Sequence, residues 1–137
     1  MPLVRISMVT GRTYEERQVI GSCVHDALVE AIGIPADDLF QVVTEYGYEE
    51  SATDEAPKLN MFWDAHYLGI ERTSGILFVQ VFLRSGRTVE QKQAFYKRAV
   101  ELLAERAGVR PEDVMITLSE NGPEDWSFGN GVAQYVK

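Results

Sequence analysis

The second residue of the chain, Pro2, is the position with the clearest chemical potential. A small second residue usually permits removal of the initiator methionine, and loss of Met1 would leave the proline as a free secondary amine. A free α-amino group has a pKa of about 7.7 to 8.0, and burial lowers that pKa because the charged form loses hydration. We therefore expect Pro2 to take or give a proton near neutral pH. The alternative is a proline that opens an edge strand, where no ladder donor is needed.

Two other residues with reactive side chains favour structural roles. Cys23 is the single cysteine, so it cannot form an internal disulfide and offers no ligand cluster for a metal. We expect it to fill a small space in the core. His25 has no serine or cysteine partner at the spacing of a nucleophilic site, which favours a histidine that is satisfied within a helix. The sequence therefore predicts chemistry that needs neither a metal nor a cofactor.

An internal repeat defines the elements that must position these residues. Residues 3–45 align without a gap on residues 78–120 at an offset of 75, and 11 of the 43 pairs are identical. Average residue usage would give about three identities by chance. Because only two copies are present, the sequence predicts a duplicated supersecondary unit inside one domain rather than a long array.

Each copy is predicted to form two strands joined by a helix. Apolar side chains occupy alternate positions along residues 4–8 and 79–83, which is the period of a strand. A second strand is expected at residues 39–44 in the first copy and at residues 114–119 in the second. Strands joined by a helical crossover are parallel, and the crossover is right-handed.

The two predicted helices carry matching signals at both ends. Thr13 and Thr88 each precede a glutamate or glutamine three residues later, which is the spacing of a capping box. Gly33 and Gly108 suit the left-handed position after the last turn, and a proline follows each of them closely. Each helix has one apolar stripe to pack on a sheet. The stripes are Ile20, Val24, Leu28 and Ala31 in the first helix, and Phe95, Ala99, Leu102 and Leu103 in the second.

A connector and a tail complete the single domain expected over residues 1–137. The connector, residues 46–77, is expected to be an exposed loop with an aromatic segment packed at its end. Residues 45–72 hold seven acidic and two basic side chains, so most of the net negative charge belongs to this region. The tail, residues 121–137, is predicted to form a glycine-rich turn and a short terminal strand.

The charge balance and the lack of long apolar runs exclude two classes of partner. The chain has 21 acidic and 13 basic side chains and a formal net charge of -8, whereas a nucleic-acid-binding face requires clustered Lys and Arg. No apolar run approaches the ~18 residues of a membrane span, and no signal-peptide pattern opens the chain. We expect a cytoplasmic protein that binds neither nucleic acid nor membrane, and that holds any anionic ligand with a few local cations.

Several motifs together carry a family resemblance. They are the Met-Pro-Leu start, the Gly-Arg-Thr runs at residues 11–13 and 86–88, the segment at residues 67–72, and the run Asp-Trp-Ser-Phe-Gly-Asn-Gly at residues 125–131. The chain resembles the tautomerase superfamily, and more narrowly its fused two-unit branch, to which malonate semialdehyde decarboxylase belongs. The resemblance implies an α/β (α+β) sandwich of two βαβ units, with the helices on one face of a four-stranded mixed sheet. It also implies a homotrimer, with Pro2 acting as general base or acid at the mouth of a small pocket.

The resemblance assigns carboxylate binding to arginines. Arg87 stands where the decarboxylases hold their substrate carboxylate, and it is the first choice. Arg12 is its equivalent in the first copy, where short-chain tautomerases place a carboxylate-binding arginine, and Arg72 could point into the same pocket. A guanidinium pairs with a carboxylate through two parallel hydrogen bonds, which orients a small substrate. The alternative is an arginine at a helix start that contacts backbone or a partner subunit.

Three further residues match family positions in the pocket. Asp38 aligns with the active-site aspartate of the decarboxylases, which is thought there to position or activate water. Its repeat partner Asp113 illustrates the alternative, a turn residue at the entry to a strand. Trp126 and Phe128 match residues that form an apolar wall, and the alternative for both is the ordinary core.

One departure from the decarboxylase pattern keeps more than one function open. The decarboxylase has a second arginine two residues before the position of Arg87, where this chain has Ser85, and the nearest candidate is Arg84. The leading hypothesis is keto-enol tautomerisation of a small oxo or enol carboxylic acid by Pro2. The first alternative is a malonate semialdehyde decarboxylase or hydratase with Pro2 protonated. The second is a ferredoxin-like module that binds a metabolite without catalysis, because the repeat specifies the fold and not the function.

Overall fold

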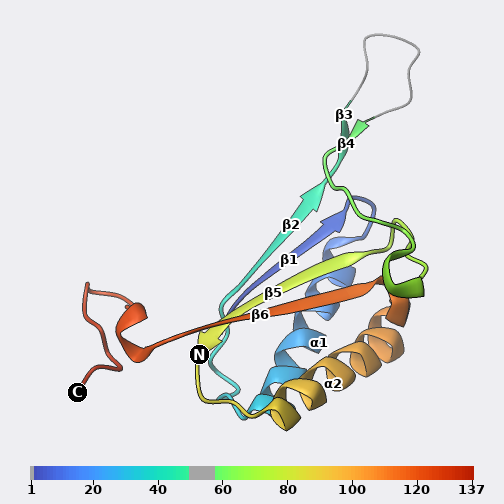
Figure 1. Ribbon diagram of the computed structural model, residues 1–137. Helices are drawn as coiled ribbons and strands as arrows, with labels where there is room; N and C mark the ends of the chain where they lie inside the picture. Colours follow the sequence, from blue (N-terminus) through green and yellow to red (C-terminus); the bar gives the residue numbers. More distant parts are fainter. Residues whose placement is uncertain (1, 50–57) are drawn as a thin grey trace.

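A four-stranded mixed sheet with two long helices on one of its faces forms the body of the molecule (Figure 1). The computed structural model describes residues 2–49 and 58–137. The body consists of β1 (Leu3–Val9), α1 (Tyr14–Ile32), β2 (Gln41–Tyr46), β5 (Leu77–Arg84), α2 (Val89–Ala107) and β6 (Val114–Asn121). The strand order is β2-β1-β5-β6, with a central antiparallel pair and parallel outer pairs. This arrangement confirms the predicted α+β fold built from two βαβ units.

The two βαβ units are related by an approximate two-fold axis between β1 and β5. Arg5 pairs directly with Gln80, which is also its equivalent at the 75-residue offset. Because β1 and β5 are antiparallel, a feature at one end of the first unit has its equivalent at the opposite end of the sheet. Leu77, the repeat equivalent of Pro2, accordingly pairs with Met8 at the far end of β1.

Both helices begin and end at the predicted residues. The hydroxyls of Thr13 and Thr88 each accept a hydrogen bond from the backbone N–H three residues later, and both capping boxes are complete. Gly33 and Gly108 follow the last turns with φ of 79° and 64°, the left-handed conformation that glycine adopts without steric cost. Since the caps fix where each helix starts, they also fix the loops at residues 10–13 and 85–88 that precede them.

The core lies between the sheet and the helices. One face of each central strand is buried against the apolar stripes of α1 and α2, and Phe95, Leu102 and Leu103 are fully buried there. Cys23 is also fully buried, with its Sγ 3.4 Å from the carbonyl oxygen of Leu102, as expected of a small core residue. His25 lies on α1 with Nε2 2.7 Å from the carbonyl oxygen of Ala36. Both side chains are therefore occupied within the fold.

The tail differs from its prediction, because no strand forms in residues 122–137. The chain instead makes the short 3-10 helix η3 (Pro123–Asp125) and then a series of turns. The Gln134 side chain holds these turns together, since its amide donates to the carbonyl of Gly129 and its oxygen accepts from the N–H of Phe128. Side-chain hydrogen bonds of this kind occupy backbone groups that a strand would offer to a ladder.

The connector is more ordered than the exposed loop predicted for it. β3 (Tyr48–Glu49) pairs with β4 (Lys58–Leu59), and the 3-10 helix η1 (Tyr67–Gly69) follows. The expected packing of an aromatic residue near its end is found at Trp63, which lies against a small buried cluster that includes Met61. Residues 50–57 of the connector lie outside the described residues.

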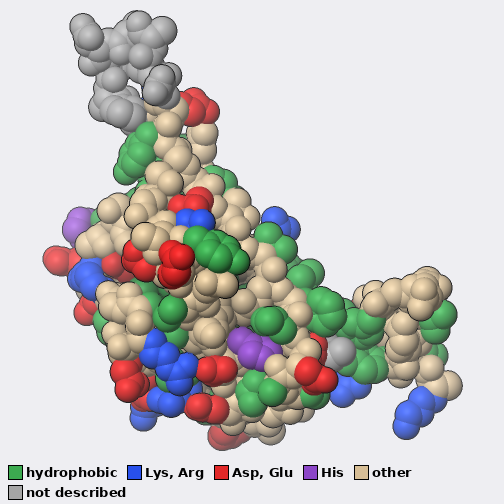
Figure 2. Space-filling model, turned by 180° about the vertical axis from the view of Figure 1, so that it is seen from behind, with side chains coloured by type: hydrophobic (Ala, Val, Ile, Leu, Met, Phe, Trp, Pro, Cys, Tyr) green, Lys and Arg blue, Asp and Glu red, His purple; other side chains and the backbone are tan. Residues whose placement is uncertain are grey.

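The surface over the helices carries acidic and basic side chains next to one another (Figure 2). Ion pairs between α1 and α2 contribute to this pattern, among them Glu30 with Arg98 and Asp26 with Arg106. The same view shows the C-terminal tail standing away from the body. Within the described part of the chain, no helix is both long and apolar enough to cross a membrane.

Candidate active site

Pro2 lies at the end of the sheet where β5 and β6 finish. It is buried and comes directly before β1. In the antiparallel ladder Leu3 pairs with Phe82, so Pro2 lies beside the last residues of β5 and the turn at residues 84–87. Figure 1 shows the start of β1 next to the end of β5. The register of the two central strands therefore places Pro2 at the end of the sheet from which the chain turns into α2.

Asp38 reaches the same end of the sheet from the other side of β1. Val4 pairs with Gln41 in the parallel ladder, and the Val4 N–H donates to the carbonyl of Phe40 at 3.0 Å. The residues just before β2 consequently lie next to Pro2. Asp38 is only 6% exposed, and its N–H donates to the carbonyl of Pro35 at 3.0 Å. Its repeat equivalent Asp113 is also buried, at 2% exposed. Carboxyl groups buried to this degree are normally held by specific polar or charged partners.

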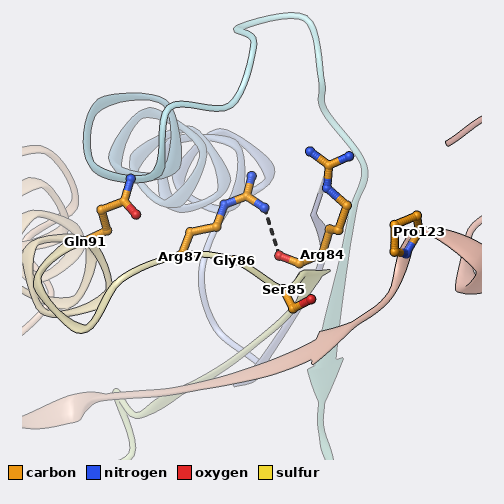
Figure 3. A pocket seen from close by; sticks show the side chains of 6 residues that line it. All are labelled: Arg84, Ser85, Gly86, Arg87, Gln91 and Pro123. Atoms are coloured by element: carbon orange, nitrogen blue, oxygen red, sulfur yellow. Dashed lines mark hydrogen bonds between the residues drawn. The ribbon is translucent and has the colours of Figure 1, made fainter.

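Arg87 and a neighbouring cavity of about 450 Å³ complete this end of the sheet. Arg87 lies in the loop before α2, and its Nη1 donates to the carbonyl of Arg84 at 2.8 Å (Figure 3). Both guanidinium groups project from the same side of the turn. The cavity is lined by Arg84, Ser85, Gly86, Arg87, Gln91 and Pro123. Two cations at one cavity are suited to a ligand that carries negative charge.

An ion pair next to Arg87 preserves this positive charge. Lys92 on α2 bonds to Glu120 on β6. The Lys92 hydrogen bond is the main cause that lowers the pKa of the Glu120 carboxyl below its usual range, and Arg87 makes a smaller electrostatic contribution. Because Lys92 balances Glu120, the turn at residues 84–87 keeps a net positive charge.

Aromatic residues of the tail form a wall near this cavity. The rings of Trp126 and Phe128 are stacked, with centroids 5.5 Å apart and an angle of 6° between their planes. Phe40 is the residue just before β2, and the centroid of its ring lies 6.3 Å from the centroid of the Phe128 ring. The indole N–H of Trp126 donates to the side-chain oxygen of Asn121 at the end of β6. The structure therefore brings the two predicted wall residues together and attaches them to the Pro2 end of the sheet.

Tyr135 links this wall to the charged residues. Its ring meets Phe128 edge-on at 5.1 Å, and the Arg84 guanidinium lies over it at 4.8 Å from the centroid. Burial raises the pKa of the Tyr135 hydroxyl, Asp38 raises it further, and Arg84 and Arg87 act in the opposite direction. All three charged side chains are thus close enough to Tyr135 to affect its ionisation, so they share one electrostatic environment.

The repeat-related end of the sheet has a different structure, because the connector fills it. Arg12, the equivalent of Arg87, donates from Nη2 to the carbonyl of Gly75 at 2.8 Å. Asp113, the equivalent of Asp38, accepts hydrogen bonds from the N–H and the hydroxyl of Thr73 at 2.7 and 2.6 Å. Residues 73–75 lead directly into Leu77, which replaces Pro2 here. At this end the equivalent of Pro2 is therefore a buried leucine, and the equivalent of Arg87 is bonded to the connector.

Arg72 also lies at the end away from Pro2. Its Nη1 donates to the backbone carbonyls of Tyr67 and Ile70 at 3.0 and 3.1 Å. It borders a second, more apolar cavity of about 270 Å³ together with Phe62 and Trp63. Within one chain Arg87 and Pro2 lie at the same end of the sheet, and Arg12 and Arg72 lie at the opposite end. In residues 2–49 and 58–137, no three His, Cys, Asp or Glu side chains gather as a metal site would require.

Comparison with known proteins gives this arrangement its family. A family model described as a tautomerase enzyme matches residues 2–50, and a second with the same description matches residues 53–129. The chain is 38% identical to the probable tautomerase YusQ of Bacillus subtilis (strain 168), over the full length of both chains. The chain belongs to the tautomerase family. The probable tautomerase YrdN of the same organism is 32% identical to this tautomerase chain, over 99% of it and 97% of the relative.

The solved structures that this chain resembles include members of the fused two-unit branch of the family. Malonate semialdehyde decarboxylase, solved as the wild type, an alanine variant of a proline and an inactivated form, is 32% identical with a TM-score of 0.83, over 97% of this tautomerase and 95% of that chain. The decarboxylase FG41, inhibited by 3-bromopropiolate, is 40% identical with a TM-score of 0.80, over 97% and 93% of the two chains. A fused 4-OT trimer shares the fold at 22% identity and a TM-score of 0.68, over 95% and 94%.

Sequence reasoning missed two residues of this site in the tautomerase chain. Phe40 falls inside the strand predicted for residues 39–44, whereas β2 begins one residue after it, and Tyr135 falls in the predicted terminal strand. Phe40 contacts Phe128 from a segment far away in the sequence, and Tyr135 contacts it because the tail folds back on itself in turns. The available signal was the departure at Ser85, which indicated that Arg84 could replace the second arginine of the decarboxylases. Nothing in the sequence indicated that the Arg84 guanidinium would lie over the ring of Tyr135.

Proposed function

We propose that this tautomerase-superfamily enzyme uses Pro2, freed by removal of Met1, to move a proton on a small oxo or enol carboxylic acid. The observation that carries the proposal is the meeting of Pro2, buried Asp38 and Arg87 at one end of the sheet. A buried amine favours its neutral form, because the charged form loses hydration. A neutral amine beside a bound carboxylate can remove a proton from the carbon next to a carbonyl.

The proposed reaction is keto-enol tautomerisation. Arg87 pairs with the substrate carboxylate and fixes its orientation. The Pro2 nitrogen accepts a proton from the carbon beside the carbonyl and returns it at another atom of the same substrate, so the enzyme is unchanged after each turnover. The wall formed by Trp126 and Phe128 excludes water and lowers the local dielectric, which strengthens the interaction between Arg87 and the carboxylate.

A second candidate function uses the same residues with Pro2 protonated. Decarboxylation or hydration of malonate semialdehyde would then depend on Asp38 to position water. Two observations favour it: the identity of 40% to the FG41 decarboxylase, and the burial of Asp38 at the Pro2 end. The pH profile separates the two candidates. Loss of rate below about pH 7 supports Pro2 as a base, and loss above about pH 8 supports it as an acid.

The test of the proposal is turnover of a generic enol acid, phenylenolpyruvate, by the wild type and by Pro2→Ala. We expect the variant to lose at least about 100-fold in kcat/KM, as is typical when a general acid or base is removed. Pro111→Ala is the matched control, because Pro111 is an exposed proline beside the opposite end of the sheet.

Three outcomes would overturn the proposal. Unchanged turnover by Pro2→Ala would exclude the ring nitrogen as the reacting group. Mass spectrometry that finds Met1 retained on active protein would place the free amine one residue away. Wild-type protein that binds carboxylates but turns over neither enols nor malonate semialdehyde would instead support the non-catalytic metabolite-binding module.

We also propose that the chain assembles as a homotrimer. The sheet face away from the helices is uncovered in one chain, and Val42 and Met115 on it are 48% and 52% exposed. The unpaired edges of β2 and β6 need protection as well. The fused 4-OT structure is a trimer with this fold, which supports three copies as the assembly.

A further inference from the structure

Asn121 is bonded both to the turn that carries the two arginines and to the aromatic wall. It is the last residue of β6 and pairs with Arg84 in the parallel ladder. Its backbone carbonyl accepts a hydrogen bond from the Ser85 N–H at 2.8 Å, and its side-chain oxygen accepts one from the indole N–H of Trp126. A single residue therefore connects the turn at residues 84–87 to the tail.

The internal repeat separates these two hydrogen bonds. Tyr46 is the equivalent of Asn121 at the 75-residue offset, and its carbonyl accepts the Thr10 N–H at 2.9 Å, so the backbone bond is a feature of both strand ends. The side chains differ, because Tyr46 packs on the buried cluster that includes Met61, whereas Asn121 bonds to the tail. The asparagine side chain is therefore specific to the Pro2 end, and the strand does not need it.

The indole N–H of Trp126 needs an acceptor because the ring is half-buried. A tryptophan side chain offers one donor and no acceptor, and a buried donor without a partner is costly. Since the rings of Trp126 and Phe128 are nearly parallel, the orientation of the indole sets that of the phenyl ring. Phe128 in turn meets Phe40 beside β2. The Asn121 bond consequently fixes the whole wall, formed by Trp126 and Phe128, relative to the sheet.

The tail stands away from the body beyond Asn121, so its position depends on such attachments (Figure 1). The hydrogen bonds of Gln134 with Phe128 and Gly129 join one part of the tail to another and do not attach it to the sheet. The Asn121 bond is directional, whereas Phe40 and Phe128 meet only as rings at 6.3 Å. Loss of the bond would therefore free the indole to turn toward water while the tail keeps its internal turns.

From these contacts we infer that Asn121 is a positioning residue, whose side chain holds the aromatic wall against the turn at residues 84–87 and so keeps water away from the Pro2 end of the sheet. Water beside Pro2 would stabilise the charged amine and raise its pKa toward the ordinary value of about 7.7 to 8.0. It would also weaken the attraction between Arg87 and a bound carboxylate. The inference rests on the proposed function for its catalytic consequence, whereas the position of Trp126 can be measured without turnover.

Tryptophan fluorescence measures the position of the indole. The chain has two tryptophans, so the experiment uses a Trp63→Phe background in which the emission comes from Trp126. Asn121→Leu has a similar shape but no acceptor, and we expect the emission to move to longer wavelength as the indole becomes hydrated. Asn121→Asp keeps an acceptor at the same place and should retain the emission of the background protein. The matched control is Asn60→Leu, since the Asn60 amide bonds to Glu49 in the connector, and it should leave the emission unchanged.

Turnover of the enol acid and its pH profile measure the effect on the site. Asn121→Leu should lower kcat/KM by about 3- to 10-fold, the size of one lost hydrogen bond. The limb of the profile that reports Pro2 should move to higher pH, whether Pro2 acts as a base or as an acid. Because Asp38, Arg84 and Arg87 are retained and leucine is uncharged, this movement reports hydration and not a change in nearby charge.

Trp126→Phe separates positioning of the wall from general damage. It removes the donor and keeps a ring, so it should move the pH profile in the same direction as Asn121→Leu. In that background Asn121→Leu should cause less than about twofold further loss of kcat/KM, because the asparagine acts through the indole. Asn60→Leu should leave kcat/KM and the pH profile unchanged. Thermal unfolding of each variant shows whether the body is intact, and Trp126→Phe remains informative if Asn121→Leu fails to fold.

Three results would overturn the inference: unchanged Trp126 emission in Asn121→Leu, a pH profile that does not move, or additive losses in the double variant. A shifted emission in a protein whose Pro2→Ala variant keeps full turnover would uphold the placement of the wall by Asn121 and reject the proposed function.

Discussion

Arg12 and Arg87 occupy equivalent positions in the two βαβ units but have different surroundings. Both stand between a glycine and the threonine that caps a helix. Arg12 bonds to the carbonyl of Gly75, which belongs to the connector. Arg87 bonds to the carbonyl of Arg84 in its own turn and lines a cavity at the end of the sheet that holds Pro2. The same local sequence therefore gives an arginine tied to the connector at one end of the sheet and an arginine that lines a cavity at the other.

This difference predicts opposite effects for two matched substitutions. Arg87→Ala should lower kcat/KM for an enol acid by about 10- to 100-fold with little effect on stability, because a charge-assisted hydrogen bond to the substrate is lost. Arg12→Ala should lower the free energy of unfolding by about 1 kcal/mol and leave kcat/KM within about threefold. Steady-state kinetics of both variants measures the change in kcat/KM, and urea unfolding measures the change in the free energy of unfolding. Equal losses of activity would instead show that Arg12 reaches a pocket on a neighbouring copy.

At the scale of the elements, helix caps and strand periods were predictable, and their spatial relation was not. The threonine and glycine signals of both helices are confirmed because capping depends on residues three or four positions apart. The antiparallel register of β1 and β5, in which Arg5 meets Gln80, depends on contacts between units and sends Arg12 away from Pro2. The turns of the tail were not predictable for a related reason. They depend on the Gln134 side chain, which bonds to the Gly129 carbonyl where a strand would have formed backbone hydrogen bonds.

The ion pair between α2 and β6 gives a prediction about acid stability. Lys92 lowers the pKa of Glu120, so the pair stabilises the fold above the unfolded carboxyl pKa of about 4.3, and this contribution is lost as the pH falls through the folded pKa. Lys92→Met should reduce the free energy of unfolding at pH 7 by less than about 1 kcal/mol, because both side chains are partly exposed.

The measurement is urea unfolding of the wild type and Lys92→Met between pH 3 and pH 7. The difference between the two proteins should narrow as the pH falls below about 4, where Glu120 takes up a proton. Lys97→Met is the control, as Lys97 is an exposed lysine of the same helix, and it should cause a small change that does not depend on pH. A difference that grows at acid pH would contradict the assigned role of Lys92.

For the whole molecule, the placement of its charges and apolar surface explains how an acidic chain can bind an acid. Much of the formal charge of -8 comes from residues 45–72, whereas the cavity at the end of the sheet that holds Pro2 is bordered by Arg84 and Arg87. The connector also blocks the second, repeat-related site through Thr73 and Gly75. With the proposed site at the Pro2 end, each chain would contribute one site, and a trimer would have three.

The uncovered sheet face gives the prediction that belongs to this scale. Covering that face with other copies of the chain would bury the exposed side chains of Met115 and Val42, which lie on the two outer strands of the sheet. Sedimentation equilibrium should give three times the chain mass of 15.4 kDa. Met115→Glu should dissociate the assembly, because a carboxylate in an apolar interface loses its hydration, whereas Val19→Glu on the exposed side of α1 should leave it unchanged. A wild-type monomer would mean that this face is covered by something other than the chain itself.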